Sequence, residues 1–571
     1  MIHKKDDVSV VLCGEAGMGI QTVEGLLTRI LKLSGRHLFA TKEYMSRVRG
    51  GANSTSIRVA SYPVSAFVGR IDVLVPLNSG AFEHVRDRLS NDTVILADLA
   101  GLGEQPDCAG HLCIDVPFGG IAQGLGNRIY SSVVAVGTLA GLFGVSVDEA
   151  VASVSAAFSR KGDAVVQPNV AAARAGHEAA CEIVRAGKLQ LEVQPDPAVA
   201  GQMFLCGADA VGLGALAAGC NFVSSYPMSP STPVLTFMAR HSNGFEIVVE
   251  QAEDEIAAIN MAMGAWYAGG RAMATTSGGG FALMTEGFSL AGMIESPLVV
   301  HLGQRPGPAT GLPTRTEQGD LNLALYAGHG EFPRVLFAPG TLQDAVELTH
   351  RAFGLADKHQ VPAVILTDQY FIDSYYNIER IDPAGLPFES FIVETGADYV
   401  RHAVTPGGVS PRGVPGFGKG FVCVDSDEHD TAARITEDRN VRVAMHEKRL
   451  RKLDGLVADV IEPRLWPQRE YRNLVVCWGS TYPIVREALE RLGRDDTSLL
   501  HYRQVYPVHR RTAELLGAAA RVIAVENNAT GQFANLIRTQ TGVNITERIL
   551  KSDGWPFSVE EMTERLGRLL A

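Results

Sequence analysis

Runs of apolar residues alternate with amphipathic stretches in the first part of the chain. Residues 8–13 are almost continuously apolar and predict a buried strand, and residues 20–33 carry apolar side chains at helical spacing. Further strands are predicted at 73–76 and 93–96, and a helix at 165–186. Strands that alternate with helices are typical of a mostly parallel sheet covered by helices. This part of the chain therefore predicts an α/β unit.

The same alternation returns twice further along the chain. In the middle, strands are predicted at 204–206, 222–223, 272–276, 298–300 and 363–367. Near the end, strands at 474–477 and 522–525 are separated by an amphipathic helix at 483–492. We therefore predict an α/β fold of three units with mostly parallel sheets.

Stretches without periodicity mark the boundaries between these units. Residues 188–200 lose helical spacing and contain two prolines, which predicts a linker. Residues 386–468 are irregular apart from a charged helix expected at about 434–460, and they predict a connecting arm. The expected organisation is a domain over 1–187, the linker over 188–200, a domain over 201–385, the arm over 386–468 and a domain over 469–571.

Composition and charge narrow the class of protein. The 571 residues are 46% hydrophobic, which allows a large core, and the net charge of −12 is unfavourable for binding nucleic acid. The basic run 448–452 is expected to be a solvated helix face, and the acidic turn 425–430 a solvated turn rather than a metal site. No apolar run reaches the roughly 18 residues of a membrane span.

The eight cysteines point to a reduced protein. None of them forms a CxxC pair, so neither a disulfide framework nor a cysteine-ligated iron–sulfur cluster is expected in this chain. The first residues are charged and lack the apolar run of a signal peptide. We therefore expect a cytoplasmic protein.

A glycine-rich loop follows the first predicted strand. Gly14, Gly17 and Gly19 precede a helix, so backbone amides there can point at an anion. The spacing differs from the GxGxxG dinucleotide fingerprint, and the nearby Arg49 adds positive charge. The loop indicates a phosphate-bearing ligand, with a tight turn without ligand as the alternative.

Two further positions carry residues suited to chemistry. Glu255 lies on a helix of small residues, where a buried carboxylate must be paired or functional, unless it belongs to a solvated acidic helix start. Only one of residues 253–255 can face inward. The glycine loop 277–280 follows a strand, where a cofactor can approach the backbone, although a flexible turn has the same pattern.

A stiff loop rich in proline and glycine also follows a predicted strand. It contains Arg305 and several threonines within residues 303–316. Arginine offers a bidentate fork to a carboxylate and threonine adds a hydroxyl donor. The loop therefore suits carboxylate recognition, and an ordinary surface loop is the alternative.

The order of these motifs resembles the α subunit of 2-oxoacid:ferredoxin oxidoreductases. The motifs are Tyr-Pro-Met-Ser-Pro at 226–230, Glu-Asp-Glu at 253–255, Thr-Ser-Gly-Gly-Gly at 276–280, Thr-Gly-Leu-Pro-Thr-Arg-Thr-Glu-Gln-Gly-Asp at 310–320 and Glu-Asn-Asn-Ala-Thr-Gly-Gln at 526–532. The N-terminal unit is similar to the γ domain of the family. The chain thus resembles a γ–α fusion, as in 2-oxoglutarate:ferredoxin oxidoreductase, with a γ-like domain, a thiamine pyrimidine-binding domain and a transketolase C-terminal-like domain.

The resemblance implies a role for each candidate residue. Glu255 matches the catalytic glutamate that hydrogen-bonds the pyrimidine ring of thiamine diphosphate, and Arg305 matches the arginine that holds the substrate carboxylate. Ser229 and Thr314 are implied to contact the substrate as well. The remaining implied contacts are Tyr226, Pro227, Ser277, Gly278 and Gly279 for thiamine diphosphate, and Gly14, Gly17, Gly19 and Arg49 for coenzyme A (CoA).

The resemblance also implies a partner chain. The family holds magnesium with a GDG motif, which occurs nowhere in this sequence. We therefore expect activity only with a β subunit that supplies the diphosphate-binding domain, Mg²⁺ and a 4Fe–4S cluster, in a dimer of αβ heterodimers that passes electrons to ferredoxin. No metal is expected in this chain.

The implied reaction is the reversible oxidative decarboxylation of 2-oxoglutarate to succinyl-CoA. A pyruvate or broad-range 2-oxoacid enzyme is the alternative within the family. A thiamine enzyme of transketolase type is disfavoured by the missing GDG motif and the γ-like unit. A non-catalytic CoA-binding scaffold protein is the remaining alternative.

Overall fold

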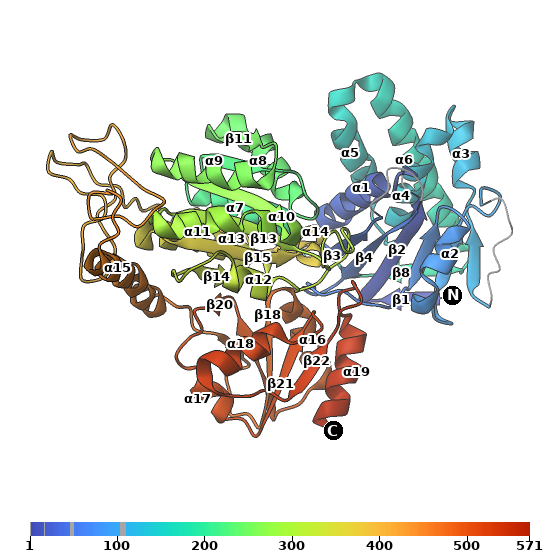
Figure 1. The fold of residues 1–571 in the computed structure, drawn as a ribbon. Coiled ribbons are helices and arrows are strands. Elements are labelled where there is room, and N and C mark those ends of the chain that lie inside the picture. Colours follow the sequence, from blue (N-terminus) through green and yellow to red (C-terminus); the bar gives the residue numbers. More distant parts are fainter. Residues whose placement is uncertain (1, 16, 46–50, 103–109) are drawn as a thin grey trace. The chain divides into compact units, whose positions relative to one another are not determined.

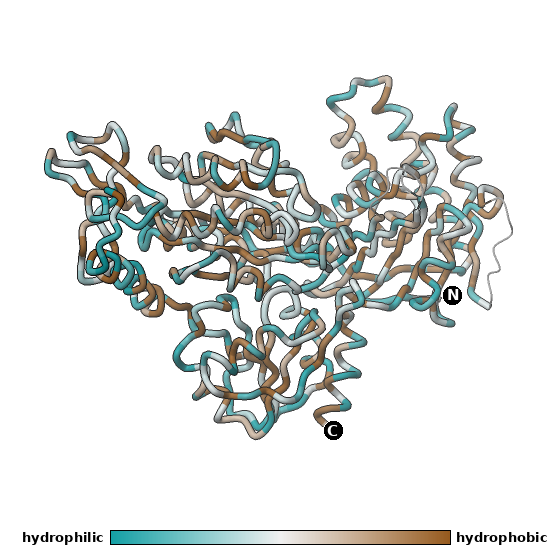
Figure 2. Tube along the Cα trace, in the orientation of Figure 1, coloured by the Kyte–Doolittle hydropathy of each residue, from teal (hydrophilic) through white to brown (hydrophobic). Residues whose placement is uncertain are grey.

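The computed structural model describes residues 2–15, 17–45, 51–102 and 110–571 (Figure 1). Their contacts divide the chain into two compact units. Unit 1 comprises Met1–Leu205, Ser374–Arg380 and Ser558–Glu561, and unit 2 comprises Cys206–Asp373, Ile381–Phe557 and Met562–Ala571. In both units the strands are largely apolar and buried, and hydrophobic residues are brown in Figure 2.

Unit 1 is built around an eight-stranded sheet. In spatial order its strands are β7 (Leu112–Asp115), β6 (Val94–Ala97), β5 (Val73–Pro76), β2 (Asp7–Glu15), β4 (Ala52–Ala60), β3 (His37–Glu43), β16 (Tyr375–Ile378) and β9 (Met203–Cys206). Strands β2, β5, β6 and β7 are parallel, whereas β4 is antiparallel to both β2 and β3. Side chains of β2 alternate between the two faces of the sheet, so Val10 and Leu12 join one apolar cluster and Val11 and Cys13 another.

Helices pack on this sheet through apolar residues at helical spacing. They are α1 (Ile20–Leu33), α2 (Gly80–His84), α3 (Phe118–Gly124), α4 (Ser131–Leu142), α5 (Val147–Phe158) and α6 (Asp163–Arg185). The bounds of α1 agree with the predicted helix. Helix α4 touches α6 so closely that a Cβ at Gly137 would lie 2.1 Å from the Ala173 carbonyl oxygen. Small residues therefore permit the tight contact between these two helices.

The predicted linker over 188–200 is wrong in part. It contains β8 (Leu189–Glu192), which pairs in parallel with β1 (Ile2–Lys5), followed by a short 3-10 helix at Pro197–Gly201. Strand β9, which we expected to open the second domain, joins the sheet of unit 1, as does β16 from the range predicted for that domain. Edge positions of a sheet accept short strands from distant parts of a chain, and local sequence pattern does not reveal this pairing.

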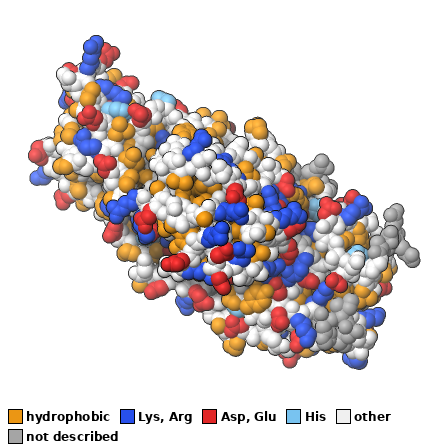
Figure 3. All heavy atoms as spheres, turned by 90° about the horizontal axis from the view of Figure 1, so that it is seen from below, with side chains coloured by type: hydrophobic (Ala, Val, Ile, Leu, Met, Phe, Trp, Pro, Cys, Tyr) orange, Lys and Arg blue, Asp and Glu red, His pale blue; other side chains and the backbone are white. Residues whose placement is uncertain are grey.

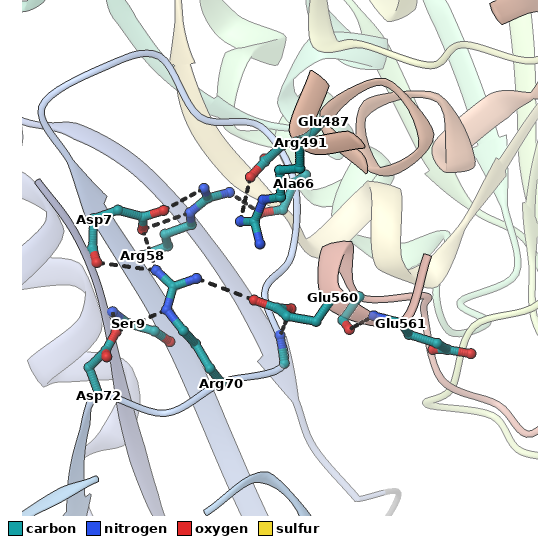
Figure 4. Close-up of polar contacts among 12 residues, drawn as sticks. Asp7, Ser9, Arg58, Ala66, Arg70, Asp72, Glu487, Arg491, Glu560 and Glu561 are labelled. Atoms are coloured by element: carbon teal, nitrogen blue, oxygen red, sulfur yellow. Dashed lines mark hydrogen bonds and ion pairs between the residues drawn. The ribbon is translucent and has the colours of Figure 1, made fainter. Parts of the chain in front are cut away.

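A buried ion cluster ties together strands of unit 1 (Figure 4). Arg58 donates to both oxygens of the Asp7 carboxylate at 3.0 and 2.7 Å. Arg70 contacts Asp7 at 2.8 Å, Asp72 at 3.3 Å and Glu560 at 3.2 Å. Burial alone would raise the pKa of Asp7, but its hydrogen bonds and ion pairs with Arg58 and Arg70 lower it overall. The two arginines thus hold the Asp7 carboxylate in its ionised form.

Unit 2 contains a seven-stranded sheet, six of whose strands come from the range predicted for the second domain and one, β20, from the range predicted for the last. Its strands, in spatial order, are β11 (Val248–Gln251), β10 (Phe222–Ser225), β12 (Ala272–Ser277), β13 (Leu298–Gln304), β15 (Pro362–Asp368), β14 (Val335–Phe337) and β20 (Gln504–Tyr506). All neighbours are parallel except β14 and β20. The helices of this part are α7 (Gly207–Ala217), α8 (Thr232–Phe245), α9 (Glu255–Tyr267), α10 (Gly278–Leu283), α11 (Thr285–Met293), α12 (Leu321–Tyr326), α13 (Leu342–His359) and α14 (Gln369–Asp373).

A five-stranded sheet forms the rest of unit 2. Its strands, in spatial order, are β17 (Arg464–Trp466), β19 (Thr497–Tyr502), β18 (Asn473–Trp478), β21 (Arg521–Glu526) and β22 (Glu547–Leu550), with helices α16 (Tyr482–Leu492), α17 (Thr512–Gly517), α18 (Gln532–Thr541) and α19 (Val559–Leu570). Only β17 runs against its neighbour. Three α/β sheets are therefore present and the predicted fold class is confirmed.

The arm holds helix α15 (Arg439–Ala458), and its basic run contradicts our prediction of a solvated face. Lys448 and Lys452 are buried, and their ammonium groups lie 2.6 and 2.5 Å from the Glu295 carboxylate. The imidazole of His402 lies 3.2 Å from the same carboxylate. Residues four apart share one helix face, so both lysines reach one buried acid. Burial alone would raise the pKa of Glu295, but the charges of Lys452 and Lys448 and the His402 hydrogen bond bring it well below its usual range.

We expect Glu295→Gln to lower the free energy of unfolding by about 3–5 kcal/mol, since it leaves two lysines buried without their counter-charge. Urea denaturation followed by circular dichroism measures this change. The matched control is Glu331→Gln, because Glu331 is 81% exposed and lies 3.4 Å from His446 in a surface ion pair. Equal stability of both variants would contradict the assigned role of the buried acid.

The surface and the helices agree with the sequence patterns. Lysine and arginine side chains are interspersed with aspartate and glutamate on the face drawn in Figure 3. Within the described ranges, none of the helices combines the length and hydropathy needed to cross a bilayer.

Candidate functional site

Polar residues gather at the carboxyl ends of the central strands of the seven-stranded sheet. Strands β10, β12, β13 and β15 end at Ser225, Ser277, Gln304 and Asp368, all of which are buried. Parallel α/β sheets bind their ligands at this edge. Buried polar side chains at four adjacent strand ends therefore mark the edge as the candidate site.

Glu255 reaches this edge from the first turn of α9. The helix begins after Asp254, whose carboxylate accepts a 2.7 Å hydrogen bond from the Ala257 amide. Glu255 is 3% exposed while Glu253 and Asp254 face solvent, so the prediction that one of the three faces inward is confirmed. The Glu255 oxygen Oε1 is covered and has no hydrogen-bond partner among the described residues. Such an acceptor is costly to bury unless a ligand donates to it.

The glycine run after β12 is helical rather than the loop that we predicted. Helix α10 begins at Gly278 directly after Ser277, which is extended. A Cβ at Gly280 would lie 2.6 Å from Glu255 Oε1 and 2.2 Å from the Thr276 hydroxyl oxygen. Gly280 is thus required for the close approach of the Glu255 carboxylate, and the hydroxyl of Ser277 beside it also lacks a partner in the described structure.

We expect Gly280→Ala to lower 2-oxoacid-dependent activity by about tenfold or more, because the added methyl group displaces the Glu255 carboxylate. The control is Gly264→Ala on α9, where an added Cβ meets no atom within 4 Å and alanine favours the helix by up to about 1 kcal/mol. Steady-state kinetics and thermal unfolding of both variants test this. Full activity of Gly280→Ala would show that the carboxylate position is unimportant.

Arg305 follows β13 and is anchored on the loop that carries Ser229. Its Nη1 atom donates to the Ser229 carbonyl oxygen at 2.6 Å. Arg305 is 8% exposed, and its Nε atom has no acceptor within the described part of the chain. Burial lowers the pKa of Arg305 and the charge of Asp320 raises it. A buried cation with a donor to spare fits an anionic ligand.

The other predicted contacts lie around Arg305 and the glycine run. Thr314 is buried in the loop after β13, and Pro227 is half-buried, whereas Tyr226 is 41% exposed. A Cβ at Gly279 would lie 3.9 Å from the sulfur of Met228, so the 226–230 loop borders the start of α10. The structure thus brings Glu255, Arg305, the 226–230 loop and the start of α10 to one edge, and it places Thr314 in the loop after β13.

Sequence reasoning missed Asp320 as a site residue. Its backbone amide donates to Gln304 Oε1 at 3.0 Å, and a Cβ at Gly278 would lie 2.5 Å from Asp320 Oδ2. Burial and the charge of Glu317 raise the pKa of Asp320 to about 7, while Arg305 lowers it. In the sequence, Asp320 is simply the last residue of the 310–320 motif. Its burial depends on Gly278, which follows strand β12 about 40 residues earlier.

The motif at 526–532 holds the site loop on the five-stranded sheet. Gln318 donates to the Trp478 carbonyl oxygen at 2.8 Å and accepts from the Asn527 amide at 2.9 Å. Asn528 donates to the Gln318 carbonyl oxygen at 3.2 Å. These hydrogen bonds position the loop between Arg305 and Asp320.

The glycine loop of unit 1 precedes α1. Gly17 and Gly19 have φ angles of 93° and 84°, which favour glycine, and no acidic side chain lies in the first turn of α1. A Cβ at Gly14 would lie 2.8 Å from that of Leu77, so packing against Leu77 requires a glycine at this position. Arg49 lies outside the described residues. The role of this loop in binding CoA stays a prediction.

The acidic turn at 425–430 is only partly solvated. His429 is buried with its ring centroid 4.2 Å from that of His402, and Glu428 binds Arg449 at 2.7 Å. The predicted solvated turn is therefore wrong at these positions, since the turn packs on α15. Over the described ranges, no three or more histidine, cysteine, aspartate or glutamate side chains cluster in a way that could hold a metal ion.

Two family models match most of the chain. Residues 213–448 match the model described as the thiamine diphosphate-binding part of pyruvate flavodoxin/ferredoxin oxidoreductase, and residues 9–179 match the model described as pyruvate ferredoxin/flavodoxin oxidoreductase. The first range contains Glu255 and Arg305, and the second contains the glycine loop.

Relatives match over the whole length. The chain is 30% identical to the 2-oxoacid:ferredoxin oxidoreductase subunit alpha of a Sulfolobus species, over 99% of this chain and 97% of that protein. It is 27% identical to the 2-oxoglutarate oxidoreductase subunit KorA of Mycobacterium tuberculosis, over 100% and 92%. The structure of 2-oxoglutarate:ferredoxin oxidoreductase from Magnetococcus marinus with 2-oxoglutarate, coenzyme A and succinyl-CoA bound aligns with a TM-score of 0.92 at 28% identity, over 100% of both chains. The chain therefore belongs to the family of 2-oxoacid:ferredoxin oxidoreductase α subunits, as its motifs indicated.

Proposed function

We propose that this chain carries the activating glutamate and the substrate arginine for the oxidative decarboxylation of 2-oxoglutarate to succinyl-CoA, with electrons passed to ferredoxin. The observation that carries the proposal is a set of buried polar atoms at one sheet edge, Glu255 Oε1, Ser277 Oγ and Arg305 Nε, without a partner among the described residues. Buried polar groups are normally hydrogen-bonded, so this set fits a bound molecule.

Thiamine diphosphate fits the part of the edge around Glu255. When bound, it supplies a nucleophilic carbon and an electron sink for decarboxylation. The Glu255 carboxylate would hold the pyrimidine ring through its unpaired oxygen, and the helix N-terminus beside it favours a negative charge. Ser277, Gly278 and Gly279 would border the ring, because glycine leaves the backbone open to close approach. Tyr226 and Pro227 are the proposed contacts from the neighbouring loop.

A 2-oxoacid fits the part of the edge around Arg305. One guanidinium nitrogen is fixed on the Ser229 carbonyl oxygen, which leaves other donors of the fork for a carboxylate. The hydroxyl groups of Ser229 and Thr314 are the proposed further donors. The match to KorA and to a structure with 2-oxoglutarate bound supports 2-oxoglutarate, whereas the name of the Sulfolobus relative supports a broader range of 2-oxoacids.

A partner chain completes the proposal. The family relatives are named as α subunits, and no GDG motif occurs in the sequence. We expect a β subunit to supply the diphosphate contacts, Mg²⁺ and a 4Fe–4S cluster within a dimer of αβ heterodimers. CoA would bind with help from Gly14, Gly17, Gly19 and Arg49, which the CoA-bound neighbour supports.

Co-purification followed by CoA-dependent viologen reduction tests the proposal. We expect the purified complex to reduce methyl viologen with 2-oxoglutarate and only in the presence of CoA. A preference for pyruvate would identify a pyruvate enzyme, and equal rates with several 2-oxoacids would identify a broad-range enzyme; either result would contradict the assignment of 2-oxoglutarate. Absence of reduction with every 2-oxoacid would contradict the enzymatic role.

A further inference from the structure

We propose that Asp320 takes up a proton when a 2-oxoacid carboxylate binds at Arg305, so that substrate binding consumes one proton. The inference rests on the proposed function and adds a residue to it. Once protonated, the Asp320 carboxyl group would donate a hydrogen bond to the substrate carboxylate instead of repelling it.

The geometry fixes Asp320 next to the substrate arginine. Gln304 accepts the Asp320 amide at 3.0 Å, and Arg305 is the next residue after Gln304. The Asp320 carboxylate packs against the start of α10, since a Cβ at Gly278 would lie 2.5 and 2.7 Å from its two oxygens. Its Oδ2 atom is covered and has no partner in the described structure. A buried carboxylate oxygen in this position either accepts a hydrogen bond from a bound ligand or carries a proton itself.

The charges around Asp320 favour its protonated, neutral form when a substrate carboxylate binds nearby. Glu317 on the same loop and burial raise the pKa of Asp320 to about 7, and Arg305 is the cation that opposes them. Glu255 and Asp368 are the other acids of this sheet edge, and α18 presents the neutral Gln532, which donates to the Gly319 carbonyl oxygen at 2.7 Å. A substrate carboxylate would share Arg305 with Asp320, and one proton removes the excess negative charge.

The sign of the coupling follows from linkage. Well below pH 7 Asp320 is protonated before binding, so an anion binds without proton uptake. Well above pH 7 Asp320 is ionised in the free protein and must gain a proton, so uptake approaches one proton per site. The association constant then falls about tenfold for each pH unit in that range.

Calorimetry with unreactive anions measures the uptake directly. The probes are oxamate and N-oxalylglycine, whose amide carbonyl resists attack, titrated into the purified complex with thiamine diphosphate and Mg²⁺. At pH 8, titrations in buffers of different ionisation enthalpy give the number of protons taken up. We expect about one proton per site, and close to none for Asp320→Asn.

Two variants keep the result interpretable. Asp320→Asn has the same shape, and its melting temperature and co-purification with the partner should match those of the unchanged chain. Glu317→Gln removes a charge that raises the pKa of Asp320, so the loss of affinity should begin at lower pH with the same slope.

The outcomes separate this inference from the proposed function. Binding of either probe with equal proton uptake in Asp320→Asn overturns the inference alone. An unchanged onset of affinity loss in Glu317→Gln overturns it as well. No binding of either probe at any pH contradicts both the inference and the proposed 2-oxoacid site.

Discussion

Glu255→Gln is expected to lower kcat for 2-oxoacid-dependent viologen reduction by about a thousandfold, the typical contribution of a positioned acid or base. The amide keeps the size of the carboxyl group but could not hold or release a proton at a bound pyrimidine ring, which is the proposed role of Glu255. Glu255 is buried and its Oε1 has no partner among the residues that the structure describes, so the change removes no hydrogen bond seen to that oxygen. The free energy of unfolding should therefore change little.

Glu253→Gln is the matched control for Glu255→Gln. It lies two residues away on the same segment and faces solvent, so it makes the same chemical change outside the site. We expect near-normal kcat for this control. Full activity of Glu255→Gln, or an equal loss in both variants, would remove Glu255 from the chemistry.

Arg305→Ala is expected to lower kcat/KM for the 2-oxoacid by about a hundredfold or more, equivalent to about 3 kcal/mol. The change removes a buried guanidinium that binds the Ser229 carbonyl oxygen and leaves a substrate carboxylate without its counter-charge. Most of the loss should be in KM, because the arginine holds the carboxylate before and during the reaction alike.

Arg240→Ala serves as the control for Arg305→Ala. Arg240 has the same charge but is 64% exposed on α8, where it lies 3.6 Å from Asp209. We expect its kcat/KM to stay close to that of the unchanged chain. An unchanged kcat/KM for Arg305→Ala would reject the carboxylate-binding role.

Local patterns predicted elements whose signal lies within their own residues. The apolar run 8–13 and the spacing at 20–33 give β2 and α1, because buried strands and amphipathic helices carry their own periodicity. Strand β8 had such a signal too, since Leu189, Leu191 and Val193 alternate and are buried. The prolines that follow favoured a linker, and β8 is only four residues long, so its short alternation was not recognised as a strand.

Side chains whose environment comes from distant residues could not be predicted. Lys448 and Lys452 look like a solvated run until the fold supplies Glu295, more than 150 residues away along the chain. Asp320 is covered by Gly278 and oriented by Gln304, neither of which is near it in sequence. By contrast, the pattern predicted that one of the three consecutive acids 253–255 faces inward, and the structure shows that this residue is Glu255.

The most direct test of the account is an electron cryomicroscopy structure of this chain with its partner, thiamine diphosphate and Mg²⁺. The account predicts that a carboxylate oxygen of Glu255 lies within hydrogen-bond distance, about 2.6–3.2 Å, of a pyrimidine ring nitrogen, while the partner chain holds the diphosphate and the metal. A ring bound far from Glu255, or a diphosphate held by this chain alone, would contradict it.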